Sequence, residues 1–198
     1  MAKKLNLFQN WFIHPDKQRQ SEFEYCRAKN YPIFDRVIYY NEYPTYTEFF
    51  KDMVRFPDDV NVLANLDIYF DKTIEMAKWI KSDIAYCLTR WEDDGKGNLK
   101  TFAEKHGGPP GEWSQDAWVF TGDKIRDFKA DFQLGKPGCD NHLAFLLNQA
   151  EFKLLNPAKD IKAIHCHNYL VHESTNRRAE QVGNGQYLRV EVTHLREL

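Results

Sequence analysis

Segments of strand composition alternate with helical patterns along the front half of the chain, and this alternation most constrains the fold. Strand-like runs lie at 5–13, 34–41, 60–70 and 84–92, and helical patterns lie at 16–30, 45–56 and 71–82. Parallel strands need crossover connections of this length, which are right-handed and usually helical. The sequence therefore predicts an α/β domain with a Rossmann-like, mostly parallel central sheet flanked by helices.

A glycine- and proline-rich stretch at 93–112 interrupts this pattern and predicts a loop excursion, of a length that is often functional. Beyond it we expect a strand at 113–122, an amphipathic helix at 141–152 and two short strands within 153–170. The tail, 173–198, is polar before it regains strand composition. Because no linker divides the chain, residues 1–198 are predicted to form one domain.

The composition is typical of a globular protein in water, with 42% hydrophobic and 28% charged residues and a formal net charge of -2. The chain lacks the excess of positive charge that would indicate a nucleic-acid partner. No run approaches the roughly 20 apolar residues of a membrane-spanning helix. The four cysteines lack C-x-x-C spacing, which favours reduced thiols and a cytoplasmic location over disulfides.

The run VNVLANLDIYF has the composition of a buried strand, yet it contains the polar residues Asn65 and Asp67 near its carboxyl end. Ligands of open parallel sheets bind beyond that end of the strands. A carboxylate there can hold a divalent cation, which in turn can hold a diphosphate. The alternative is that Asp67 and Asp71 only begin the following helix, as acids near helix N-termini often do.

Histidines form a second candidate group, because IKAIHCHNYL places His165 and His167 two residues apart and therefore on one face of a strand. Such a pair suits one metal ion, whereas a single histidine of this kind is more often a hydrogen-bonded structural residue.

Two further acids lie at predicted element ends. Asp140 follows a glycine-rich loop at the start of the 141–152 helix and is either a helix cap or a reactive group. Asp116 lies between Trp113 and Trp118, whose rings suit a sugar but are as a rule core residues in a strand.

Three stretches in order, VLANLDIYFDKTI, SQDAWVF and GKPGCDNHLAFLLNQAEFKLLNPAKDIKAIHCHN, resemble GT-A-fold nucleotide-sugar glycosyltransferases. The resemblance covers about residues 5–170 and is to small bacterial and viral members whose strand reads N-x-D-I-x-F-D. It implies that Asn65-Leu66-Asp67 stands for the D-x-D motif that binds metal and donor diphosphate, with Asn in place of the first acid. It further implies Asp140 as catalytic base and His165 or His167 as the late metal ligand, with Mn²⁺ or Mg²⁺ as cofactor.

The implied reaction transfers a sugar from a UDP- or GDP-sugar to a carbohydrate or other hydroxyl acceptor, with inversion if Asp140 is the base. Asp116 is the second choice for that role. The nucleotide is expected over the first strands, near Gln9, Asn10 and Arg19, although Arg19 is alternatively a solvated helix end.

Two other functions start from the same residues. One is a metal-dependent phosphoesterase or nuclease built from the aspartates and histidines. The other is a non-catalytic carbohydrate-binding module that uses Trp91, Trp113 and Trp118.

Overall fold

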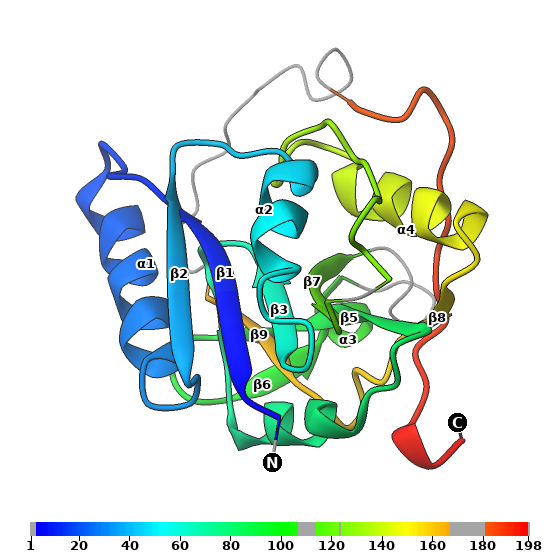
Figure 1. The fold of residues 1–198 in the computed structure, drawn as a ribbon. Coiled ribbons are helices and arrows are strands. Elements are labelled where there is room, and N and C mark those ends of the chain that lie inside the picture. Colours follow the sequence, from blue (N-terminus) through cyan, green and yellow to red (C-terminus); the bar gives the residue numbers. More distant parts are fainter. Residues whose placement is uncertain (1–2, 107–113, 123, 167–180, 198) are drawn as a thin grey trace.

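The protein is described by a computed structural model at residues 3–106, 114–122, 124–166 and 181–197. A nine-stranded mixed sheet dominates it, with the strand order β2-β1-β3-β7-β5-β9-β4 and with β6 and β8 both paired to β5 (Figure 1). Its strands are β1 Leu5–Trp11, β2 Arg36–Asn41, β3 Val60–Ala64, β4 Ile68–Phe70, β5 Ile84–Asp93, β6 Leu99–Thr101, β7 Gln115–Phe120, β8 Lys153–Leu155 and β9 Ala163–Cys166. The helices are α1 Lys17–Asn30, α2 Tyr46–Met53, α3 Phe102–His106 and α4 Cys139–Gln149, with the 3-10 helices η1 Lys72–Trp79 and η2 Leu195–Glu197.

The predicted mostly parallel sheet flanked by helices is wrong. β1 is parallel to β2 and β3, but β7 is antiparallel to both of its neighbours, β3 and β5, and β4 is antiparallel to β9. The sheet curls into a half-barrel with few helices against it (Figure 1). The physical reason is that an antiparallel neighbour needs no helical crossover, so the apolar run of β7 fits a strand of either direction.

The strand predicted over 60–70 is two strands. β3 ends at Ala64, the backbone turns with Ile68 N–H donating to Asn65 O at 3.1 Å, and β4 begins at Ile68. β3 stays in the middle of the sheet beside β1 and β7, while β4 pairs with β9 at the end of the strand order. Asp67 therefore lies in the break between a central strand and an edge strand.

Several local predictions also need correction. Within the predicted helix 71–82 the structure has the 3-10 helix η1, whose last residue, Trp79, is 86% exposed. The excursion at 93–112 contains β6 and α3 among its described residues. The tail has strand composition, yet in its described part only the bridge between Asn156 and Val192 joins it to another segment by strand pairing.

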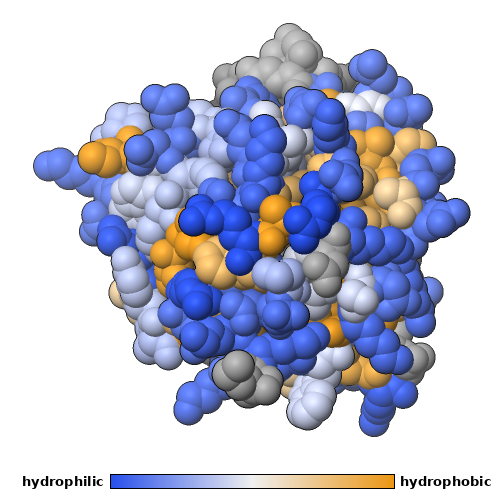
Figure 2. Space-filling view, viewed as in Figure 1, coloured by the Kyte–Doolittle hydropathy of each residue, from blue (hydrophilic) through white to orange (hydrophobic). Residues whose placement is uncertain are grey.

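Apolar side chains pack on both faces of the sheet. α2 and α4 cover one face, where Phe49, Met53 and Leu143 meet Trp118. On the other face, Ile74 and Ala77 of η1 meet Val62 and further residues of the strands. Polar side chains dominate the molecular surface in Figure 2, with small apolar areas between them. No helix in the described part of the chain is long and apolar enough to cross a bilayer.

Candidate functional site

Asp67 is held by side chains from two distant segments. Arg19, in the first turn of α1, donates from Nη2 to Asp67 Oδ2, and His165 Nε2 of β9 lies 3.2 Å from the same oxygen. Arg19 also donates to Glu22 and to the Cys166 carbonyl, at 2.7 and 3.2 Å. Arg19 is therefore not a solvated helix end, and its guanidinium joins α1 to the turn before β4.

Asp67 does not begin a helix. The cap of η1 is Asp71, whose Oδ1 accepts from Thr73 N–H at 2.9 Å. Burial favours the neutral form of Asp67, but the imidazole of His165 and the guanidinium of Arg19 outweigh it and hold the pKa of this carboxyl well below its usual range. The side chain is thus a carboxylate surrounded by cations.

A buried glutamate orients the histidine. Glu92 of β5 is in register with His165 of β9, and its Oε2 lies 3.1 Å from His165 Nδ1. Its carboxylate also accepts from Arg90 Nε at 2.7 Å and from Lys105 Nζ of α3 at 2.8 Å. Burial lowers the pKa of His165, yet Asp67 and Glu92 raise it to about 9, so the imidazole bridges two carboxylates as a cation when no metal is bound.

Arg90 extends the network to Asp116. Its Nη1 lies 3.2 and 3.3 Å from the two oxygens of Asp116, whose side chain is 8% exposed. Between the pairs Leu88–Ala117 and Thr89–Gln115, β7 advances two residues while β5 advances one. Asp116 is the extra residue of this β-bulge, a device that redirects a side chain out of the regular alternation of a strand.

Asp140 lies in the first turn of α4 but is not its cap. The N-cap is Gly138, in the left-handed conformation with φ 79°, and it makes no side-chain cap hydrogen bond. Asp140 Oδ1 accepts from the Cys139 thiol at 3.2 Å. Burial and then the nearby charge of Asp116 raise the pKa of Asp140 to about 8, which suits a group that exchanges a proton near neutral pH.

The other predicted residues have varied positions. Gln9 Nε2 donates to Asn65 O at 2.8 Å, and Asn65 Nδ2 lies 3.5 Å from Asp116 Oδ1, so both support the turn rather than facing outward. Asn10 is buried near the end of β1. His167 and Trp113 lie outside the described residues.

Two of the three tryptophans named for a carbohydrate-binding module, Trp91 and Trp118, have described positions, and both contact other parts of the protein. Trp118 is fully buried. Trp91 donates from Nε1 to the Ala158 carbonyl at 2.7 Å, and Lys162 Nζ lies 5.1 Å from the centre of its ring.

Arg90 and Glu92 were not among the predicted site residues, although they hold the site together. The signal available in the sequence was the run IAYCLTRWED, in which charged side chains alternate at the end of an otherwise apolar strand. Charges on one face of a buried strand need partners, and only the fold shows that these partners are Asp116 and His165.

Asp67 and His165 would hold a divalent cation only in place of their present contacts. Asp67 Oδ2 and His165 Nε2 lie 3.2 Å apart in a hydrogen bond, and Arg19 donates to the same oxygen, so a bound cation would replace the imidazole proton and displace the guanidinium. Glu92 behind the imidazole is the carboxylate partner that metal-binding histidines usually have. No three His, Cys, Asp or Glu side chains of the described residues form a complete metal site, so further ligands would come from a bound diphosphate or water.

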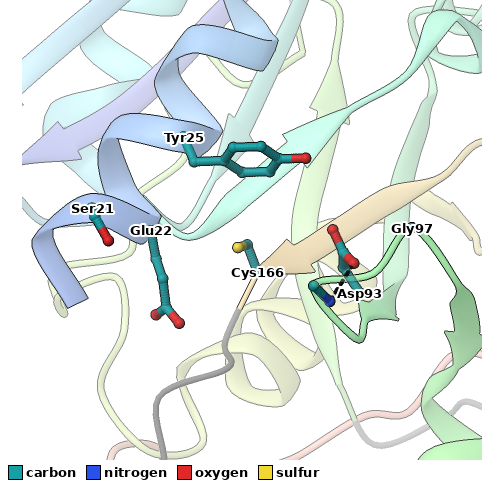
Figure 3. Close-up of a pocket in the computed structure, with 7 residues that line it drawn as sticks. Ser21, Glu22, Tyr25, Asp93, Gly97 and Cys166 are labelled. Carbon is teal, nitrogen blue, oxygen red and sulfur yellow. Dashed lines mark hydrogen bonds between the residues drawn. The ribbon is translucent and has the colours of Figure 1, made fainter. Parts of the chain in front are cut away.

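A pocket of about 330 Å³ adjoins this network between α1 and the turn that follows β5 (Figure 3). Glu22 and Tyr25 of α1 line one side, and Asp93 and Cys166 line the other. Glu22 is the ion-pair partner of Arg19, so the pocket and Asp67 share one guanidinium between them.

No protein-family model and no curated protein sequence matches the chain.

Proposed function

We propose that the protein is a metal-dependent glycosyltransferase, which moves a sugar from a nucleoside-diphosphate sugar to a hydroxyl acceptor. One observation carries the proposal. Asp67 and His165, a carboxylate and an imidazole 3.2 Å apart, lie in one charge network, and Asp140, whose pKa is raised to about 8, interacts with Asp116 and Arg90 of the same network. Glycosyl transfer from a diphosphate needs both functions at once, because a diphosphate must leave and a hydroxyl must lose its proton.

The two carboxyl groups have different roles in this reaction. Asp67 and His165 would hold Mn²⁺ or Mg²⁺, which when bound would neutralise the leaving diphosphate. Asp140 accepts the acceptor's hydroxyl proton while the hydroxyl oxygen bonds to the anomeric carbon. The bond from that carbon to the diphosphate oxygen breaks, and the diphosphate leaves with the electron pair. Attack on the face opposite the leaving group inverts the anomeric configuration.

Other features support the choice of substrates. Arg19 is a cation beside Asp67 and suits a diphosphate, since a guanidinium binds phosphate oxygens through several N–H groups. We propose a UDP- or GDP-sugar as donor and a carbohydrate or another hydroxyl compound as acceptor. The cysteines of the chain are free and buried, and for this reason we place the reaction in the cytoplasm.

A metal-dependent phosphoesterase is the second candidate, because Asp67, Glu92, Asp116 and Asp140 all belong to the network or face it. Two-metal hydrolysis needs carboxylates open to metal. Arg90 binds both Glu92 and Asp116, which leaves those two paired with a guanidinium and favours the transferase.

Calorimetric titration of UDP and GDP, with Mn²⁺ and with EDTA, tests the proposal. We expect Mn²⁺-dependent binding of one nucleotide, and we expect Asp67→Asn to weaken it tenfold or more, about 1.4 kcal/mol. Asp71→Asn is the matched control, since Asp71 is four residues away and caps η1.

Equal Mn²⁺-dependent affinities in the parent and Asp67→Asn proteins would remove Asp67 from the site. If the protein instead hydrolyses a P–O bond of a phosphate ester or nucleotide, and never transfers a donor sugar to a hydroxyl compound, the phosphoesterase is correct.

A further inference from the structure

The charges of two carboxyl groups, Asp116 and Asp140, interact at this site, and the surroundings of the two groups differ. Asp116 accepts from Arg90 through both oxygens and from the Ser114 hydroxyl, with Asn65 Nδ2 at 3.5 Å. An ionised carboxylate can only accept hydrogen bonds, and each of these neighbours of Asp116 is a donor. Its lone pairs are directed at protein groups, which leaves little room for a substrate hydroxyl.

Asp140 has the opposite environment. It is partly exposed, and its hydrogen bonds are with the Cys139 thiol, a weak donor 3.2 Å from Oδ1, and with the Tyr46 hydroxyl. The groups that face it are Asp116 of β7, Arg90 of β5, Cys139 of α4 and Tyr46 of α2. Among these described groups Arg90 is the one cation, and its hydrogen bonds go to Asp116 and Glu92 rather than to Asp140.

The guanidinium is itself held in place from three sides. Nε donates to Glu92 Oε1 at 2.7 Å, Nη1 faces Asp116, and the Arg90 Cζ atom lies 5.1 Å from the centre of the Phe102 ring. Its side chain is 20% exposed. Arg90 therefore has a fixed orientation toward one carboxylate of the pair.

We infer that Arg90 is a positioning residue, which fixes Asp116 among donors and so leaves Asp140 as the carboxylate that takes the proton of an acceptor hydroxyl. The inference rests on the proposed function for the identity of that hydroxyl. It also removes Asp116 as an alternative base. The charge of Asp116 then has an indirect use, because a fixed anion nearby makes Asp140 hold a proton more firmly.

The test is a pH titration of ligand-free protein by NMR, with ¹³C in the aspartate carboxyl carbons. The Asp140 signal is assigned by its loss in Asp140→Asn. We expect its midpoint to fall by about 1 pH unit in Asp116→Asn, because the like charge is removed. In Arg90→Gln, the second proton of the pair Asp116 and Asp140 should be lost at a higher pH than in the parent, because a nearby cation is gone. Arg90→Lys keeps the charge and should bring that midpoint part of the way back to the parental value.

A purely structural Arg90 gives a different result. In that case Arg90→Gln lowers the melting temperature and the Asp140 midpoint stays where it is. Arg36→Gln is the matched control, because Arg36 pairs with Asp59 away from this site. Its removal should change neither the melting temperature nor the Asp140 midpoint. If Arg90→Gln does not fold, Asp116→Asn and Arg90→Lys still decide, and an unchanged midpoint in Asp116→Asn overturns the inference.

No donor or acceptor is present in this titration, so its outcome is separate from that of the proposed function. Unchanged midpoints in a protein that transfers sugar refute the role of Arg90 alone. Shifted midpoints in a protein that transfers nothing refute the glycosyltransferase, and leave Arg90 as the group that controls the proton of this pair.

Discussion

At the scale of single residues, the raised pKa of Asp140 lowers the stability of the folded protein as the pH rises. Its pKa rises from 3.8 to about 8 on folding, first because the carboxyl group loses much of its hydration although the residue is partly exposed, and then because Asp116 is near. Between these values the folded protein holds a proton that the unfolded chain releases. Unfolding is therefore favoured progressively as the pH rises through this window, by up to about 1.4 kcal/mol per pH unit.

Asp140→Asn should therefore gain stability over the parent as the pH rises from 5 to 8, because the amide has no proton to lose. We expect the difference in the free energy of unfolding to grow by at least about 1 kcal/mol over that range. Urea denaturation at pH 5, 6.5 and 8 measures it, with the exposed substitution Asp58→Asn as control. A difference that is constant with pH would mean that Asp140 is charged in the folded protein across the whole range.

The same substitution should abolish most of the proposed activity. Asparagine cannot take up the hydroxyl proton, so turnover is expected to fall by about 10²-fold or more while donor binding remains. Initial rates and calorimetry on one preparation give both quantities. Parental turnover in a well-folded Asp140→Asn protein would assign the base to another group.

The sequence indicated some of these residues and not others, for a physical reason. Asp67, Asp140 and His165 were predicted because each interrupts an apolar pattern close to the end of an element. Arg90 and Glu92 lie inside a strand, and their roles in the site depend on Asp116 and His165, which lie 26 and 73 residues away along the chain. No local pattern carries that information.

At the scale of elements, one side chain of α1 completes the edge of the sheet. Asn30, the last residue of α1, donates from Nδ2 to Ile68 O and accepts at Oδ1 from Phe70 N–H, both at 3.0 Å. Its amide thus takes the place of a neighbouring strand along β4, next to the turn that holds Asp67. The amide has this role because the strand order ends at β4.

Asn30→Ala should destabilise the protein by about 2–4 kcal/mol, since it leaves a buried N–H without a partner and removes a donor from a buried carbonyl. Thermal and urea unfolding measure the loss. Lys29→Ala, at the exposed neighbouring position, should cost no more than about 0.5 kcal/mol. Equal effects of the two substitutions would contradict the role given to the amide.

The boundaries of most elements followed from residue patterns, whereas the break at Asn65–Asp67 did not. That turn contains neither glycine nor proline, and apolar residues continue on both sides of it. The break exists because β3 and β4 have different partners, and pairing across the sheet is set by distant strands.

At the scale of the whole molecule, the sheet joins two apolar clusters into one unit. β5 has the central part in this, because it pairs with β7 and β8 through its first half and with β6 and β9 through its second half. The direction of β7 was not predictable, since six buried residues in a row suit a parallel or an antiparallel neighbour equally. The prediction of a single domain stays a prediction.

A single cooperative unit should unfold in one step. We expect the urea transitions followed by tryptophan fluorescence and by far-UV circular dichroism to coincide. Trp118 is fully buried and reports on the sheet, whereas Trp79 is 86% exposed, so Trp79→Phe should lower the background emission and leave the midpoint unchanged. Two separate midpoints would show that the chain contains two units.

The distance along the chain between Asp67 and His165, 98 residues, has a consequence for synthesis. While the ribosome is still adding the residues after α4, the turn before β4 already exists, yet its imidazole partner and the strand that pairs with β4 do not. A nascent chain can therefore place Arg19 on Asp67 long before the cation site is complete. If Asp67 and His165 hold the proposed cation, that site is complete only once residue 165 has left the ribosome, and shorter nascent chains lack it.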